Sequence, residues 1–341
     1  MRPQGLRWLA GLVWLLGVCG AAAAEELARH EFERAEMGLP FRLVLYARSE
    51  AEARQAAEAA FGRIHELNGV LSDYDEASEL SRLSATAGSG RWVPLGTDLA
   101  RVLRAAQAAS AASDGAFDVT VGPLVQLWKR ARRQRELPGE AALARAREAT
   151  GWRHLSLRRR GGGWEARLER PGMRLDLGGI AKGYALDEAA IVLRRLGVRQ
   201  FLIGGSGDLV AGDAPPGAPG WRIEVGVSDH PKAPAPLFVR IRNEGLATSG
   251  DLFQRAEIGG RRYSHIVDPA TGIGLTDQSL VTVIAPTGMQ ADALATQLSV
   301  LGPSRGGLLI RRADAEYLLY RVGDGPFERW RSKGFDRYRW P

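Results

Sequence analysis

The stretch MRLDLGGIAKGYALDEAAIVLRRLG, residues 173–197, decides the fold class of this chain. MRLDLGGI predicts a strand that runs into a glycine turn, and the remainder predicts a helix that stops at Gly197. Further strands follow this helix without a regular βαβ alternation, which favours an α+β fold over a doubly wound sheet. The strands predicted after the helix are QFLIGG (200–205), WRIEVGV (221–227), LFVRIRN (237–243) and LVTVIAP (280–286).

Elements on either side of this stretch agree with the α+β class. LPFRLVLYA (39–47) has apolar residues at alternate positions, which predicts a strand. Helices are expected at 49–71, where Ser49 begins a capping box, and at 97–113, capped by Thr97. The other expected elements are a basic helical segment ending near 150, a hairpin of 154–160 with 164–170, a helix over 289–302 and a strand over 315–322. We therefore expect mixed or antiparallel sheets packed with helices, in one compact unit of two lobes.

The N-terminal residues have the pattern of an export signal. Arg2 and Arg7 precede an apolar run at 8–18, and an alanine run then supplies a cleavage site. The apolar run is too short for a comfortable transmembrane helix, which needs roughly 20 apolar residues. We therefore predict a signal peptide over 1–24 and a mature domain over 25–341. An uncleaved N-terminal membrane anchor is the alternative.

Cys19, the only cysteine, lies inside the predicted signal. Val18 stands where a lipoprotein cleavage site has a small residue, so lipid anchoring is the less favoured interpretation. Cleavage after Ala24 leaves a mature chain without cysteine, which excludes disulfides, thiolate catalysis and zinc–thiolate sites. The core must then supply the stability of the fold outside the cytoplasm.

The charge balance favours anionic ligands. The formal net charge is +7, and it falls by two, to +5, when the arginines of the signal are removed. Much of the remaining positive charge lies in WKRARRQRELP and LRRR, which predict solvated faces. Basic and aromatic residues are not interleaved and no nucleic-acid motif is present, so we expect no nucleic-acid partner.

The glycine pair in DLGGIAKG lies at the predicted junction between strand and helix. Free backbone N–H groups at such a junction suit a phosphate, and Lys182 could add a positive charge for the same anion. The GxxxxGK[ST] spacing of a Walker loop is absent. The structural alternative is a tight turn at Gly178 and Gly179 beside a surface lysine.

Two further stretches carry groups suited to catalysis. His265, in YSHIVDPATG, is expected at a strand end beside a turn, as a general base or as a hydrogen-bonded structural histidine. Asp292 and Thr296, in QADALATQLSVLG, lie one turn apart on one helical face. One carboxylate and one hydroxyl suit a Mg²⁺ ion that also binds substrate phosphate oxygens and water. The alternative is that both side chains only satisfy nearby backbone groups.

The order of these motifs resembles that of the ApbE-type flavin transferases, the FAD:protein FMN transferases. The resemblance spans nearly the whole mature chain, from MGLPFRLVLYA to the GF that ends at Phe335. The motifs that carry it are LSDYDEASELSRLS, GAFDVTVGPLVQLW, DLGGIAKGYALD, GLATSGD, RYSHIVDPATG and ADALAT. Two positions depart from the family pattern: Leu39 replaces a small hydroxyl residue, and GGSGD is one residue longer than the usual GGD.

The resemblance implies an α+β catalytic domain that uses Mg²⁺ to cleave FAD, passes FMN to a threonine of a partner protein and releases AMP. It implies Mg²⁺ binding by Asp292, Thr296 and the backbone carbonyl of Gly179. It also implies that His265 activates the acceptor hydroxyl, which is a poor nucleophile until a base takes its proton. The residues that it implies for FAD binding are Met37, Tyr74, Ala116, Phe117, Asp118, Asp176, Lys182 and Ile266.

The resemblance further implies an exported acceptor protein, such as a subunit of a membrane redox pump. The chain itself has no S/T-G-A-T acceptor motif. We expect a periplasmic enzyme, either free or attached to the inner membrane. Two alternatives remain at this point: a periplasmic FAD pyrophosphatase that gives FMN and AMP, and a flavin-binding protein without turnover.

Overall fold

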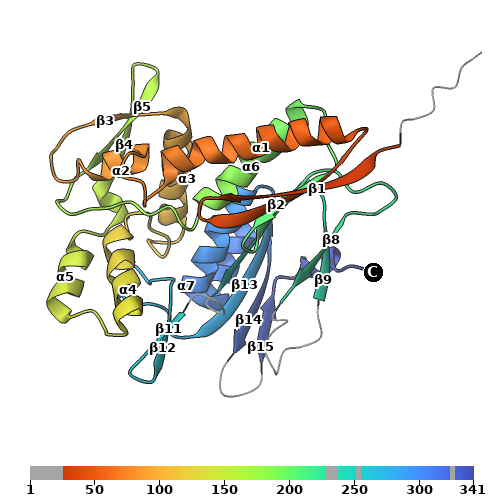
Figure 1. Cartoon of the computed structure of the whole chain (residues 1–341). Coiled ribbons are helices and arrows are strands. Elements are labelled where there is room, and N and C mark those ends of the chain that lie inside the picture. Colours follow the sequence, from red (N-terminus) through yellow and green to blue (C-terminus); the bar gives the residue numbers. More distant parts are fainter. Residues whose placement is uncertain (1–25, 227–236, 251–254, 323–326) are drawn as a thin grey trace, which may run out of the picture.

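A computed structural model describes residues 26–226, 237–250, 255–322 and 327–341 of the chain (Figure 1). The predicted signal peptide, its cysteine and the expected first mature residue, Glu25, lie outside the described residues. No helix in the described ranges has both the length and the apolar character needed to cross a membrane.

The largest sheet of the described residues has eight strands, and each neighbouring pair is antiparallel. Their order in the sheet is β1 (Ala28–Glu36), β2 (Leu39–Ala47), β6 (Phe201–Gly205), β7 (Asp208–Ala211), β10 (Gly245–Gly250), β13 (Gln278–Ala285), β14 (Glu316–Val322) and β15 (Glu328–Arg331). Strands from both ends of the chain thus share one sheet, which agrees with the expected α+β class.

Within the described ranges, three smaller antiparallel sheets lie outside the main one. They are β3 (Val93–Leu95) with β5 (Gly163–Leu168) and β4 (Leu155–Arg160), β8 (Trp221–Val225) with β9 (Leu237–Ile241), and β11 (Arg255–Ile258) with β12 (Arg261–Ser264). The helices are α1 (Glu50–Leu71), α2 (Glu79–Ser84), α3 (Thr97–Ala112), α4 (Gly122–Gln134), α5 (Glu140–Glu148), α6 (Ala181–Arg195) and α7 (Gly288–Arg312). In Figure 1 the group formed by α2–α5 and β3–β5 lies to the left of the main sheet.

The segment 173–180 is not the strand that its pattern predicts. It forms one isolated bridge, between Arg174 and Val121. Its backbone N–H groups bond elsewhere: Leu175 N–H donates to Ser84 Oγ at 3.1 Å, and Asp176 N–H donates to the carbonyl of residue 119 at 2.8 Å. The segment is therefore extended and buried, but no strand runs along it.

Three other expectations about elements need correction. The sequence reading missed β1, and the predicted helix over 289–302 continues past a kink at Gly302, where φ is +69°. Thr97 is the first residue of α3 and not its cap, because Gly96 occupies the N-cap position. The predicted cap of α1 is confirmed, since Ser49 Oγ accepts the N–H of Glu52 at 3.2 Å.

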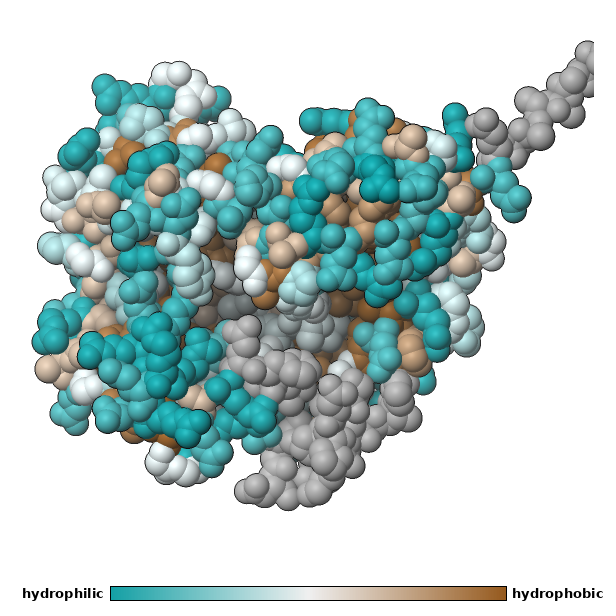
Figure 2. Space-filling model, viewed as in Figure 1, coloured by the Kyte–Doolittle hydropathy of each residue, from teal (hydrophilic) through white to brown (hydrophobic). Residues whose placement is uncertain are grey.

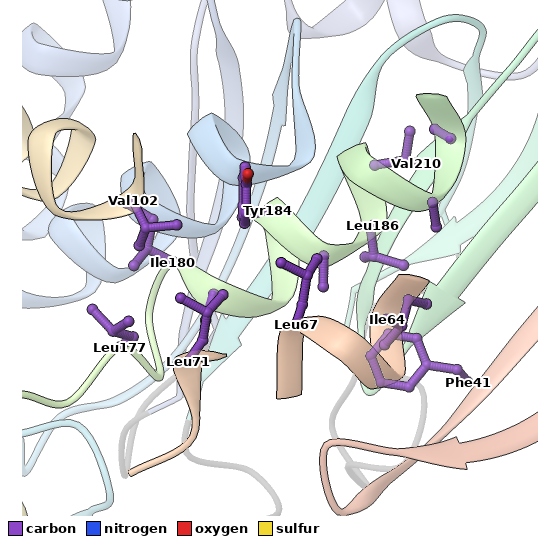
Figure 3. Packing of buried hydrophobic residues seen from close by; sticks show 14 of the residues in the cluster. Phe41, Ile64, Leu67, Leu71, Val102, Leu177, Ile180, Tyr184, Leu186 and Val210 are labelled. Carbon is purple, nitrogen blue, oxygen red and sulfur yellow. The ribbon is translucent and has the colours of Figure 1, made fainter. Parts of the chain in front are cut away.

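The main core lies between α1, α6 and the sheet. α6 presents small buried residues, among them Ala185 and Ala189, which allow α1 to approach closely. Figure 3 shows Ile64 and Leu67 of α1 beside Leu186 of α6. Each fully buried side chain of this size contributes about 1.5–3 kcal/mol. This core fixes α6, and through it the glycine turn that precedes the helix.

The outer surface seen in Figure 2 is mostly hydrophilic, with small apolar areas between the polar side chains. Lys and Arg outnumber Asp and Glu by 46 to 39 over the whole chain. Many of the arginines pair with carboxylates or lie over aromatic rings, as Arg104 does over Trp164. The surface charges thus have partners of their own, so we expect the candidate site among the buried polar side chains.

Candidate functional site

The candidate site is built where α6 packs against the start of α7. A Cβ added at Gly183 would overlap the backbone of Gly288, so only glycine permits this approach. The carboxylate of Asp187 accepts the N–H groups of Gly288 at 2.7 Å and Met289 at 2.9 Å. Two of the free N–H groups at the helix start are thereby satisfied. The N-terminus of α7 is thus fixed on α6.

This packing brings the three predicted Mg²⁺ ligands into one cluster. Asp292 is 5% exposed, and its Oδ2 accepts the N–H of Gly183 at 3.2 Å. A Cβ added at Gly179 would lie 2.8 Å from Thr296 Oγ1 and 3.2 Å from the ring of Phe117. Gly179 therefore faces the hydroxyl of Thr296 one helical turn beyond Asp292.

The oxygen atoms of this cluster are of the chemical kinds that bind Mg²⁺. They comprise a buried carboxylate, a hydroxyl and a glycine backbone that a side chain would obstruct. Across the described part of the chain there is no group of three His, Cys, Asp or Glu side chains that could bind a metal. Mg²⁺ needs no such group, because it takes one or two carboxylates and completes its shell with phosphate oxygens and water.

Lys182 lies between two buried carboxylates. Its Nζ contacts Asp208 Oδ2 directly and lies 3.7 Å from Asp292 Oδ1. Burial opposes the charge on Lys182, but the two carboxylates outweigh it and raise the pKa of the lysine. Burial likewise raises the pKa of Asp208 and brings that of Asp292 to about 7, with Lys182 opposing both changes. The site therefore retains a partly buried, charged ammonium group.

From the sequence alone, Asp208 is assigned no role. GGSGD is notable for its glycines and its extra residue, but nothing in it shows which group its carboxylate faces. Ser206 and Gly207 form a two-residue turn between β6 and β7, with φ of +51° and +91°. Asp208 directly follows this turn, and its Oδ1 accepts the N–H of Thr248 at 3.2 Å. The longer motif is thus accommodated as a tight hairpin.

The segment containing Ala116, Phe117 and Asp118 joins α3 to α4 and borders the glycine turn. Phe117 is buried, and its N–H donates to Ser113 Oγ at 3.0 Å. Ala116 is half-buried next to it. Phe117 thus lies beside Gly179, while its predicted contact with FAD stays a prediction.

The carboxylate of Asp118 is bound within the protein. It accepts the Thr120 hydroxyl at 2.7 Å, the Thr120 N–H at 2.8 Å and the Trp152 N–H at 2.8 Å. Burial raises its pKa, and these hydrogen bonds oppose that change. This side chain holds the loop between α3 and α4 against residue 152.

Asp176 and Tyr74 are linked by a lysine that the sequence reading did not single out. Lys129 Nζ lies 3.0 Å from Asp73 Oδ2, 3.9 Å from Asp176 Oδ2 and 4.2 Å from the centroid of the Tyr74 ring. Burial and the charge of Asp73 raise the pKa of Asp176. Tyr74 is 78% exposed, so its ring is open to a ligand on the other side.

His265 lies directly after β12, at the strand end that its sequence context predicts, and Ile266 follows it in the same loop. Two backbone hydrogen bonds fix this loop, from Ser264 N–H to the Leu275 carbonyl at 2.7 Å and from Leu275 N–H to the Ile266 carbonyl at 2.9 Å. Both residues are half-buried. The Trp128 indole N–H of α4 donates to the Gly272 carbonyl at 2.8 Å and anchors the same loop.

Met37 lies in the turn between β1 and β2. Its φ is +51°, and its side chain packs partly buried against the main core. Leu39, the residue that departs from the family pattern, packs against the same core. Because Phe41 pairs with Gly205, the β1–β2 turn and the β6–β7 turn lie at the same end of the strands in the sheet.

Comparison with known proteins gives a consistent set of matches. The model of the ApbE family matches residues 37–319. The chain is 30% identical to the FAD:protein FMN transferase of Klebsiella pneumoniae over 335 residues, covering 96% of this chain and 95% of the relative. It is 34% identical to the FAD:protein FMN transferase of Treponema pallidum over 328 residues, covering 91% and 90%.

Solved structures of flavin transferases are also similar to this chain over most of its length. The flavin transferase ApbE from Vibrio cholerae superposes with a TM-score of 0.81 at 28% identity, covering 92% of this chain and 99% of that one. The apo form of the Pseudomonas stutzeri flavinyl transferase ApbE gives a TM-score of 0.80 at 30% identity, covering 92% and 97%. Sequence and fold therefore match over nearly the full length of these proteins.

Proposed function

Since this chain belongs to the ApbE family and is an FAD:protein FMN transferase, we propose that it uses Mg²⁺ and that its acceptor is a threonine of an exported partner protein. The observation that carries the proposal is the cluster of Gly179, Asp292 and Thr296 beside Lys182. Hard oxygen ligands next to a partly buried ammonium group suit a diphosphate and its divalent ion.

The residues of the cluster have distinct parts in the proposed reaction. Bound Mg²⁺ would neutralise negative charge on the FAD diphosphate. Asp292, Thr296 and the carbonyl of Gly179 would hold that ion, while Lys182 places its ammonium against the same phosphates. α6 and α7 are fixed on each other before the substrate arrives, so little reorganisation is needed.

His265 would take the proton of the acceptor hydroxyl. The threonine oxygen forms a bond to the phosphorus of the FMN half, and the bond from that phosphorus to the AMP phosphate breaks. AMP leaves with the electron pair of the broken bond, and the hydroxyl proton passes to His265. The atoms and charges balance without an oxidant or reductant.

Transfer onto a defined acceptor tests the proposal. Purified mature chain, FAD and MgCl₂ are incubated with a candidate exported protein, and in-gel flavin fluorescence and mass spectrometry follow the acceptor. We expect FMN on one threonine, together with an equal amount of AMP. FMN and AMP released at the same rate without an acceptor would instead indicate an FAD pyrophosphatase. FAD that stays intact in millimolar Mg²⁺ would indicate a flavin-binding protein.

We also propose that the chain is exported and acts in the periplasm, free or attached to the inner membrane. The support is the pattern of the first 24 residues, with two arginines before a short apolar run and an alanine-rich cleavage site. An exported enzyme would meet acceptors such as redox-pump subunits after their own export.

A further inference from the structure

Asp208 and Asp292 present similar carboxylates to one lysine, but at unequal distances. The ammonium of Lys182 is in direct contact with Asp208, whereas 3.7 Å separates it from Asp292 Oδ1. The side chains of the two aspartates are 3% and 7% exposed, so neither can exchange its partner for water easily. The position of Lys182 therefore decides how strongly each carboxylate is neutralised.

Each carboxylate has one oxygen fixed by the backbone and one that faces the lysine. Asp208 Oδ1 accepts the Thr248 N–H, and Asp292 Oδ2 accepts the Gly183 N–H, both at 3.2 Å. Thr248 belongs to β10, and its N–H also donates to the carbonyl of Gly207 at 3.1 Å. Asp208 is thus anchored on the sheet, at the start of β7 and against β10.

We propose that Asp208 is a positioning residue that holds the Lys182 ammonium off Asp292 and so keeps Asp292 Oδ1 available to a divalent cation. Without Asp208, Asp292 is the one carboxylate among the described residues that remains as a partner for the ammonium. A divalent cation would then have to displace the ammonium from Asp292, because a buried carboxylate is stable only when it is paired with a positive charge. The same arrangement keeps the ammonium ready for an anionic substrate. This assignment rests on the Mg²⁺ site of the proposed function.

Binding of Mn²⁺ alone, without FAD, tests the assignment independently of turnover. Mn²⁺ prefers the same oxygen ligands as Mg²⁺, and its free concentration can be read by electron paramagnetic resonance. For Asp208→Asn we expect the dissociation constant to rise about tenfold or more, as for other residues that orient metal ligands. Adding Lys182→Met to this variant removes the competing ammonium and should restore an affinity within about threefold of wild type.

A matched control separates positioning from simple loss of charge. Glu188→Gln removes one carboxylate from α6, the helix that carries Lys182. Glu188 pairs there with Arg63 and Arg101. The substitution should change the Mn²⁺ dissociation constant by less than about twofold, because the charge of Glu188 is neutralised locally. A change as large as that of Asp208→Asn would show that net charge, not position, sets the affinity, and would overturn the assignment.

Lys182→Met alone keeps the test decisive if Asp208→Asn does not fold. Both carboxylates then face the cation without a competitor, so we expect tighter Mn²⁺ binding than in wild type. Weaker binding in this variant, or unchanged binding in a folded Asp208→Asn, would overturn the role of Asp208 and leave the proposed function intact. A folded wild-type chain that binds no Mn²⁺ would overturn both.

Discussion

At the scale of single residues, the candidate site consists of side-chain oxygen atoms that helix packing brings next to Gly179 and Lys182. The spacing of Asp292 and Thr296 predicts that they share a helical face, and the structure places Gly179 against that face. Asp208 could not be predicted in the same way, because it meets Lys182 across 26 positions of sequence. Local patterns specify which groups a helix presents, but only tertiary packing specifies what they meet.

Replacing Asp292 tests the proposed ion site. In Asp292→Ala the site loses its carboxylate ligand for Mg²⁺, and Lys182 alone faces the diphosphate charge, so we expect FAD cleavage to fall on the order of a hundredfold or more. FAD binding measured without Mg²⁺ should change little, and Lys182 keeps Asp208 as a partner. The control is Asp277→Ala, which removes an aspartate that pairs with Arg321 at the surface. Equal loss of FAD binding and cleavage in Asp292→Ala would indicate a structural role instead.

Replacing His265 separates acceptor activation from flavin binding. We expect His265→Ala to lower the rate of FMN transfer roughly a hundredfold, since general-base catalysis contributes about that much, while equilibrium FAD binding stays near wild type. Time courses of acceptor fluorescence measure the first effect, and fluorescence titration with FAD measures the second. His65→Ala, at a side chain 75% exposed on α1, is the control. Undiminished transfer in His265→Ala would rule out the proposed base.

At the scale of elements, periodicity predicted burial better than it predicted strand pairing. Met173, Leu175 and Leu177 are all buried, as the alternation in MRLDLGGI requires. The backbone N–H groups of this segment, however, donate to a side-chain hydroxyl and a loop carbonyl and not to a strand partner. β1 was missed for the opposite reason. It is an edge strand rich in Arg and Glu, so it pairs without an apolar pattern.

The contact between α6 and α7 can be tested with two glycine substitutions. In Gly183→Ala the new methyl group would overlap the backbone of Gly288, so we expect a loss of about 1–3 kcal/mol or more in the free energy of unfolding. In Gly62→Ala, within α1, a Cβ meets nothing within 4 Å, and alanine should stabilise the helix by about 0.5–1 kcal/mol. Urea unfolding measures both, and a Gly183→Ala chain as stable as wild type would contradict the close approach.

At the scale of the whole molecule, one sheet joins the two ends of the described chain. β2 and β6 are adjacent in this sheet, yet their paired residues lie from 156 (Leu45 with Phe201) to 164 (Phe41 with Gly205) positions apart in sequence, so long-range pairing assembles the fold. The packing of α6 against α7 likewise joins two motifs that are distant in sequence, DLGGIAKG and ADALAT, at Gly179, Gly183, Asp292 and Thr296. Sequence alone could therefore give the fold class, while the strand order required the structure.

The export proposal belongs to this scale as well. Expression of the full chain in a bacterium that has a periplasm should yield a product that begins near Glu25, because the alanine-rich site precedes it. Cell fractionation followed by intact-mass spectrometry measures this. Recovery of a cytoplasmic chain that retains its first 24 residues would contradict the proposal.

The most direct test of the account is a crystal of the mature chain with FAD and Mn²⁺, examined by anomalous diffraction. We expect one Mn²⁺ peak bound by Asp292, Thr296 and the carbonyl of Gly179, in contact with the diphosphate of FAD. A dinucleotide seated elsewhere, or a peak that contacts none of these three residues, would contradict the account.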